Sequence, residues 1–414
     1  MRNRRQHRIG AACFSLLLLG GAGCDSLLDV PDPDTVTVES VDPLADAETF
    51  SRSAYQNFVS AVPLTILYMA WFTNEARVGD TFPTRNAFGR RIIDARSNGD
   101  LSGLWGDLSL AVASSEDVLD LLADVEGADT NVNIARAAFS SGYAMLFTAD
   151  AFCQGTIRGG PALDQNAMLD HAIARLQRAR DIGAASGDEE GAAIANAAKV
   201  GLARAYLAKG DLTNAASAAA DVPDDFVYEM EYSADPGNRG RLGNDLYTFT
   251  VARLSLVVGP EWRAIADAGD KRISYGDAGR LAQDGKLHFW TQGKYGNYDA
   301  PIRLASGLEA RYIEAEASGD INRQLTLINE RRSANGLGTF SSSDTAEVLA
   351  ELMNQKARDF WLEGHRMGDW RRNGDAVPFI IPTGPNYYKP ELGEVGDATC
   401  WPLPTSETDF NPNF

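Results

Sequence analysis

Glu363 and His365 are the residues whose types and spacing come nearest to an acid/base pair in this sequence. A carboxylate and an imidazole can share proton transfer when both side chains reach the same substrate atom. Glu314 and Glu316 form another close carboxylate pair, but residues two apart on a helix point to different faces and make a poor dyad. Of the two pairs, the first is the one that could do this chemistry.

Metal and cofactor motifs are absent from the sequence. Three histidines, His171, His288 and His365, follow the N-terminal segment described below, and no two of them have the His-x-x-x-His spacing of a metal site. No Gly-x-Ser-x-Gly, phosphate-binding loop or dinucleotide fingerprint occurs in a strand-helix context. The sequence therefore predicts no metal, no cofactor and no enzymatic activity.

Sugar recognition is the other chemistry that the residue types allow, because sugars present C–H-rich ring faces to aromatic side chains and hydroxyls to planar polar groups. The candidate ligand-binding residues are Trp71, Asn74, Arg77, Trp290, Tyr295, Tyr298 and Tyr388. Trp105, Trp361 and Trp370 are assigned to the core instead. The alternative, that the candidate aromatic side chains also pack in the core, stays open, and for Trp71 the two readings are evenly balanced.

The charge balance limits the partners. The 414 residues include 57 Asp+Glu and 38 Lys+Arg, which gives a formal net charge of -19. A nucleic-acid backbone would be repelled, since no basic stripe offsets this charge. Hydrophobic residues at 44% and aromatic residues at 9% are typical of a globular protein. Neutral sugars are therefore better candidate ligands than polyanions.

Residues 1–23 have the order of a secretory signal peptide. Arginines within the first eight residues precede an apolar stretch at 9–19, and small residues at 20–23 lead to Cys24. The apolar stretch is shorter than the roughly 20 residues of a permanent membrane span. A cysteine after Ala-Gly resembles a bacterial lipobox, although Gly21 stands where Leu is usual. We predict lipidation at Cys24; ordinary cleavage with a free Cys24 is the alternative.

Cleavage before Cys24 changes the charge and the set of cysteines. It removes four arginines and no acid, so the formal charge becomes -19 - 4 = -23. Residues 24–37 then form the lipidated cysteine and a flexible tether, because the prolines in this stretch prevent a helix or central strand. Cys153 and Cys400 would lie outside the cytoplasm, where a disulfide is a candidate. Two buried free thiols are the alternative.

The body of the chain reads as mainly α. Residues 45–220 are rich in Ala and Leu at helical spacing. The Gly-Asp pairs at 187–188, 210–211 and 319–320 each stand between helical segments, where Gly suits a helix end and Asp a helix start. Residues 201–211 resemble the first helix and turn of a tetratricopeptide unit. We predict tetratricopeptide-like helical hairpins; a generic helical bundle is the alternative.

Residues 221–300 interrupt this pattern with Pro, Gly and scattered aromatic residues. Short strands are expected at 248–254 and 286–290, and a further helix is expected to open at Pro301. Long connections in a compact protein usually carry function. The sequence therefore predicts a loop-rich, aromatic-containing insertion built onto the helical scaffold.

Several C-terminal motifs, together with the Cys24 signal, resemble the SusD/RagB family of outer-membrane nutrient-binding lipoproteins. The motifs are Glu363–Arg366 with the following Asp369 and Arg371, and the closing Pro404, Glu407 and Asn411-Pro412-Asn413. The resemblance also covers the helix at 105–122, the hairpins and most of 301–414. After residues 303–305 the spacing departs from the family pattern by about one helical turn.

The resemblance implies a SusD-like α-α superhelix, with 38–414 as a single domain whose signature region is 301–414. It implies that the Glu363–His365 run is structural. It also implies a noncatalytic lipoprotein, lipid-anchored (by palmitate, for example) and surface-exposed on the outer membrane, that captures oligosaccharides for a TonB-dependent, SusC-like barrel. Binding of peptides or another nutrient, or a role as a tetratricopeptide-type protein-interaction adaptor, is the alternative.

Overall fold

The computed structural model describes residues 42–414, and their fold is mainly helical, as the sequence predicts. The predicted signal peptide at 1–23, the lipidation site Cys24 and the tether at 24–37 lie outside the described residues. Residues 43–414 belong to one unit. None of the described helices combines the length and apolar character that a membrane crossing requires.

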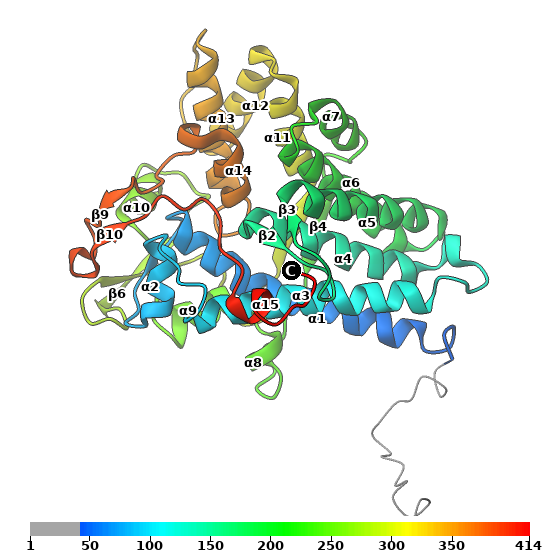
Figure 1. The fold of residues 1–414 in the computed structure, drawn as a ribbon. Helices are drawn as coiled ribbons and strands as arrows, with labels where there is room; N and C mark the ends of the chain where they lie inside the picture. The colour runs from blue at the N-terminus through cyan, green and yellow to red at the C-terminus, as the bar shows by residue number, and fades with distance from the viewer. Residues whose placement is uncertain (1–41) are drawn as a thin grey trace, which may run out of the picture. The chain divides into compact units, whose positions relative to one another are not determined.

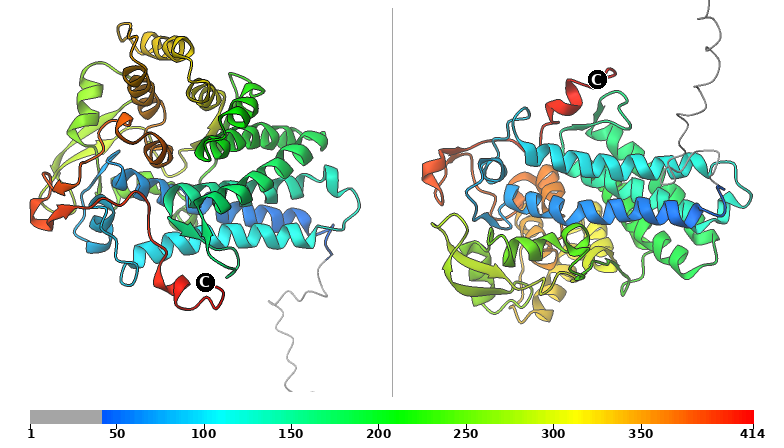
Figure 2. Two further views of the ribbon diagram at one scale, coloured as in Figure 1. Left: turned by 45° about the horizontal axis from the view of Figure 1, so that its top comes forward. Right: turned by 90° about the horizontal axis from the view of Figure 1, so that it is seen from below.

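Helices from the first part of the chain lie side by side in sequence order (Figures 1 and 2). They are α1 (Ala47–Phe72), α2 (Pro83–Gly89), α3 (Gly99–Leu121), α4 (Val132–Ala151), α5 (Gln165–Ala185), α6 (Glu189–Ala208) and α7 (Leu212–Ala220), with a 3-10 turn at Ala128–Thr130. Each helix from α3 to α6 packs against its successor, and α1 packs against α3 and α4. The predicted hairpins are confirmed.

The Gly-Asp turns between these helices work as the sequence predicts. Gly210 ends the α6 hairpin turn at φ 76°, a left-handed conformation that glycine adopts without steric cost. Asp211 then caps α7 by accepting a hydrogen bond from the Asn214 N–H at 3.2 Å, and Asp188 caps α6 through the Glu190 N–H at 2.7 Å. Local sequence alone therefore sets where these helices begin and end.

Small residues let the paired helices approach closely. A Cβ on Gly183 of α5 would lie 2.6 Å from the backbone oxygen of Gly191 in α6. A Cβ on Gly142 of α4 would lie 2.6 Å from Leu176 of α5. Any larger side chain at these crossings would push the helices apart, which explains the Ala- and Gly-rich composition of the hairpins.

A second group of helices completes the scaffold. These are α11 (Gly307–Ser318), α12 (Ile321–Ala334), α13 (Thr345–Asp359) and α14 (Arg366–Asn373), followed by a 3-10 turn at Gly374–Ala376. Helix α11 packs against α6 and α7, and α14 packs against α1 and α4. The C-terminal signature region is thereby joined to the first helical group.

The region between these groups contains short strands and helices joined by long loops. Its elements are β4 (Val227–Met230), α8 (Arg239–Leu242), α9 (Asp245–Val251), β5 (Leu256–Val257), α10 (Pro260–Asp267), β6 (Tyr275–Leu281), β7 (His288–Gln292) and β8 (Ile302–Ser306). Antiparallel pairs join β4 to β8, β6 to β7, and β5 to β1 (Arg77–Val78).

Two local predictions in this region are wrong. The segment at 248–254 is not a strand, because Asn244 caps a helix by accepting from the Tyr247 N–H at 3.3 Å, and α9 runs through Thr248. The segment opening at Pro301 is strand β8 rather than a helix, and Ser306 caps α11 only afterwards. In the first case the Asn244 cap starts a helix where a strand was predicted, and in the second the chain pairs with β4 before the Ser306 cap starts α11.

The C-terminal segment crosses back over the first helices. Its elements are β9 (Gly384–Pro385), a 3-10 turn at Pro390–Leu392, β10 (Glu394–Val395), which pairs with β9, and α15 (Thr405–Thr408). A further pair, β2 (Gln154–Gly155) with β3 (Leu163–Asp164), lies between α4 and α5 in the chain. Cys153 and Cys400 are joined in a disulfide with a Cα–Cα distance of 5.2 Å. The adjacent Trp401 is fully buried against Phe88 and Phe152. Core packing and a covalent bond thus hold this segment to α4.

Candidate ligand-binding site

Four of the residues predicted to bind ligand are buried: Arg77, described below, and Trp71, Asn74 and Tyr295, for which the prediction is corrected. Trp71 is 1% exposed and packs against Tyr68 and Phe249, at the end of α1 that α9 covers. Asn74 is 3% exposed and donates to the Phe379 carbonyl at 2.9 Å. Tyr295 is 3% exposed, and its hydroxyl donates to a backbone carbonyl at 2.9 Å. Tertiary contacts from distant segments take up these side chains.

Two of the predicted residues, Arg77 and Tyr388, come together in one cluster. The Arg77 guanidinium lies 5.0 Å from the ring centre of Tyr388 and 5.2 Å from that of Tyr387. It also donates to Glu261 Oε1 at 2.7 Å, and the Tyr387 hydroxyl donates to the same oxygen at 3.0 Å. We call these four residues the Arg77 cluster; Tyr387, 56% exposed, is the ring that it presents to solvent.

Trp290 lies on a separate surface formed by the β6–β7 pair. The register places Trp290 opposite Asp277, and the Tyr275 ring meets the indole edge-on at 5.6 Å between ring centres. The His288 ring lies 4.7 Å from the indole, and the Arg263 guanidinium lies 4.2 Å from its ring centre. These five residues form the Trp290 surface; each of them is half-buried or exposed.

Helix α10 contributes one residue to the Arg77 cluster and one to the Trp290 surface. Trp262 is fully buried, stacks on Trp361 at 5.9 Å and donates its indole N–H to the Asn74 carbonyl at 2.7 Å. Its two neighbours in sequence, Glu261 and Arg263, therefore emerge on either side of the buried face of the helix. One contributes to the Arg77 cluster and the other to the Trp290 surface.

Tyr298, the last of the predicted aromatic residues, belongs to neither group. Its ring packs edge-on against Tyr247 at 4.9 Å and lies under the Arg239 guanidinium at 4.6 Å. The Asn244 backbone N–H and side chain fix this loop by donating to the carbonyls of Tyr298 and Ala300. The ring therefore holds the loop against α8 and α9.

The residues of these two groups that the sequence did not predict as ligand-binding include Glu261, Arg263, Tyr275, Asp277 and His288. No local signal marks them, since each acquires its neighbours through strand register or through the burial of Trp262. The one usable hint was the alternation of β7, in which Trp290 and His288 share a face of the strand.

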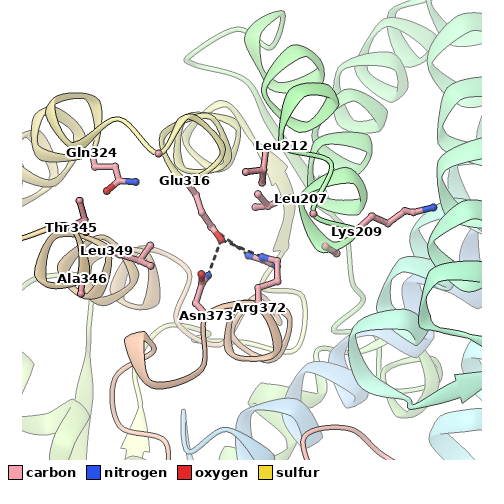
Figure 3. Close-up of a pocket in the computed structure, with 13 residues that line it drawn as sticks. Leu207, Lys209, Leu212, Glu316, Gln324, Thr345, Ala346, Leu349, Arg372 and Asn373 are labelled. Carbon is pink, nitrogen blue, oxygen red and sulfur yellow. Dashed lines mark hydrogen bonds and ion pairs between the residues drawn. The ribbon is translucent and has the colours of Figure 1, made fainter.

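A hollow of about 730 Å³ lies elsewhere, between α6, α7 and the second helical group (Figure 3). We call it the repeat cleft. Residues at its edges come from the α6–α7 turn, from α11 and α12, and from α13 and α14. Those labelled in Figure 3 include Leu207, Leu212, Glu316, Leu349 and Arg372, and its lining contains no aromatic side chain.

The charged groups at the repeat cleft are paired within the protein, Lys209 with Asp170 and Glu316 with Arg372. Glu316 accepts from Asn373 at 2.8 Å and from the Arg372 Nε at 3.3 Å (Figure 3). The Lys356 Nζ lies 3.7 Å from the same carboxylate. Burial alone would raise the pKa of Glu316, but the positive charges of Arg372 and Lys356 bring it down to about 2. The carboxylate is thus fully used within the protein.

Glu363 and His365 are structural, as the family resemblance implies. Glu363 accepts from the Lys294 Nζ at 2.6 Å and from the Arg303 Nε at 2.9 Å. Burial lowers the pKa of His365 well below its ordinary value, so the imidazole is neutral, 3.6 Å from Glu309. These groups lie in the interior and hold the signature region together.

Within residues 42–414 no group of three or more His, Cys, Asp or Glu side chains could hold a metal ion.

Comparison with known proteins supports the fold through structure rather than sequence. No protein-family model matches the chain, and no curated protein matches it. A SusD superfamily protein from Parabacteroides distasonis superposes with a TM-score of 0.68 at 17% identity, covering 90% of this chain and 98% of its own.

Two further solved structures are similar to the same extent. A laminarin-binding SusD-like protein has a TM-score of 0.66 at 15% identity, with 89% of this chain and 98% of its own covered. Surface glycan-binding protein A from Bacteroides uniformis has a TM-score of 0.65 at 15% identity, with the same 89% and 98%. The likeness therefore spans nearly the whole of each chain.

Proposed function

Because the chain has the SusD-like fold, we propose that it is a noncatalytic surface lipoprotein that binds oligosaccharides. In this proposal, lipid on Cys24 anchors the protein to the outer membrane, and the bound sugar passes to a TonB-dependent, SusC-like transporter. Two proteins of similar fold are described as laminarin-binding and surface glycan-binding.

The Trp290 surface is the observation that carries the proposal. It combines the indole, phenol and imidazole rings and the carboxylate of one strand pair with a guanidinium from α10. Aromatic rings accept the C–H faces of sugars, and the polar groups can bind hydroxyls. The repeat cleft has a volume of about 730 Å³ but offers no aromatic ring.

Calorimetric titration of the detergent-solubilised mature protein with a panel of oligosaccharides, laminarin fragments included, tests the binding. We expect Trp290→Ala to weaken the affinity about tenfold or more, since it removes the central ring of the surface. Tyr298→Ala is the matched control, because its ring packs elsewhere, and should leave the affinity unchanged. A panel with no binder, or equal binding by Trp290→Ala, would count against the proposal.

The anchor and the transporter are tested separately. Labelling with a palmitate analogue should mark the wild type and not Cys24→Ser. The detergent-solubilised wild type should co-purify with an outer-membrane barrel and return each bound oligosaccharide uncut. Labelling of Cys24→Ser would refute the lipid anchor at Cys24. Purification without a barrel would refute the transporter partner, and shortened sugars would refute the noncatalytic role.

A further inference from the structure

Arg263 is a positive charge without a negative partner at the centre of the Trp290 surface. Its guanidinium lies 4.2 Å from the indole centre and 6.0 Å from that of Tyr275. Among the described residues it forms no ion pair, and its Nε is buried without a hydrogen-bond partner. The side chain is half-buried, so this charge is partly withdrawn from water and only weakly compensated.

The acidic residues around Arg263 are engaged by other groups. Asp267 accepts a hydrogen bond from the Tyr275 hydroxyl at 2.6 Å. Asp277 lies 2.5 Å from the His288 Nε2 and accepts from the Gly279 N–H at 2.7 Å. Glu261, on the other flank of α10, is bound by Arg77. Their positions leave the Arg263 guanidinium facing the aromatic rings instead of a carboxylate.

Arg77 of β1, whose ion-pair partner Glu261 lies on α10, shows what a compensated arginine looks like. It too lies over aromatic rings, but its guanidinium pairs with Glu261 at 2.7 Å and donates to the Tyr387 hydroxyl oxygen at 3.2 Å. The two arginines thus share an aromatic environment and differ in whether a carboxylate is present. A ligand that supplied a carboxylate would give Arg263 the partner that Arg77 already has.

We propose that the Trp290 surface binds a saccharide unit that carries a carboxylate, that is, a uronic acid. The sugar ring contacts the aromatic side chains, and its carboxylate accepts charge-assisted hydrogen bonds from Arg263. A guanidinium can rest on a ring face and still donate along its edge, and its planar fork matches a carboxylate. The inference rests on the proposed function, since it names the sugar class that this surface selects.

The overall acidity of the protein sets the limit of this selectivity. A formal charge of -19 repels polyanions at long range. A single arginine offsets this repulsion locally, so one uronate unit per surface is favoured over a densely charged polymer. Salt should weaken the contact, because an exposed charge pair is screened at physiological ionic strength.

The test compares one sugar in two charge states. Trigalacturonic acid, trimannuronic acid and their methyl esters present the same rings with and without the carboxylate, and laminaritriose serves as the neutral reference. We expect the detergent-solubilised mature wild type to bind at least one acid about tenfold or more tighter than its ester. Arg263→Ala should bring acid and ester to similar affinity, and Arg263→Lys should retain part of the difference.

Arg241→Ala is the matched control, since it removes one exposed positive charge on α8 and should preserve the preference. Thermal unfolding of each variant excludes loss of the fold. If neutral sugars bind and no acid is preferred, or if Arg263→Ala keeps the preference, the inference is wrong while the proposed function stands. If no sugar of either kind binds, both the inference and the proposed function are wrong. Binding of a glutamate-rich peptide, with no binding of any sugar, would contradict both as well.

Discussion

The repeat cleft and the Trp290 surface differ in whether their charged groups have partners of opposite charge. The buried carboxylates near them, Glu316 and Glu75, differ in the same respect. Beneath the cleft, Arg372 and Lys356 outweigh the burial of Glu316 and hold its pKa at about 2. Behind α10, burial raises the pKa of Glu75 to about 7, although Arg366 and the Leu362 N–H act in the opposite direction. Glu75 Oε2 also lacks a hydrogen-bond partner.

The comparison shows that the volume of a cleft does not determine whether its polar groups are free to bind a ligand. The cleft has volume, but the carboxylate within it is consumed by its own arginine and asparagine, so a ligand would have to displace existing bonds. The Trp290 surface instead keeps a cation and aromatic rings available. Variants at both places can test this difference.

Breaking the network beneath the cleft should have the largest effect. Glu316→Ala leaves Arg372 and Lys356 without this carboxylate in the interior, and we expect the free energy of unfolding to fall by about 3–5 kcal/mol. Urea denaturation measures the loss. Oligosaccharide affinity of the folded fraction should not change.

The control for this variant lies two residues earlier on α11. Glu314→Ala removes an ion pair with Arg323 whose side chains are 32% and 50% exposed, so the expected cost is at most about 1 kcal/mol. Equal destabilisation by the two variants would mean that the interior position of Glu316 has no special role.

The next effect is a pH dependence centred on Glu75. Its pKa is near 4.5 when unfolded and about 7 when folded, so the folded state binds the extra proton. Stability from this group is complete below pH 4.5 and is lost as the pH rises through 7, by roughly 3 kcal/mol. Glu75→Gln should remove this loss and make the protein more stable than the wild type at pH 8, as measured by urea denaturation at a series of pH values. An unchanged pH profile would contradict the assignment.

The smallest expected effects compare the two arginines on either side of α10. Arg77→Ala leaves Glu261 without its charged donor and should cost about 2 kcal/mol of unfolding free energy. Arg263→Ala removes only the cation–π contacts with Trp290 and Tyr275 and should cost about 1 kcal/mol or less. Thermal denaturation distinguishes them; a larger cost at Arg263 would show that this residue is structural.

Much of the fold could be predicted because its signals are local. Helical periodicity and Gly-Asp turns predicted the helices and hairpins of residues 45–220, and Gly210 and Asp211 behave accordingly. The strand and helix errors at 248–254 and Pro301 arose where a single capping residue, Asn244 or Ser306, decided the element. Short elements have too few residues for periodicity to outweigh one cap.

The candidate site was predicted in part, and the reason lies in burial. Trp71 and Trp290 are equivalent as residue types, yet one packs under Phe249 and the other lies on an outer strand face. Nothing in the neighbouring sequence separates them, because the covering residue is far away along the chain. The Arg77 cluster illustrates the same point, since Arg77 and Tyr387 are 310 residues apart.

By itself, the sequence determined the helical scaffold, its turns and the acidic character of the chain, since these depend on neighbouring residues and on composition. Tertiary structure alone decided which aromatic rings are exposed and which charges have partners. Burial and ion pairing are settled when distant segments meet, as when Trp262 turns inward and leaves Glu261 paired with Arg77 but Arg263 without a carboxylate.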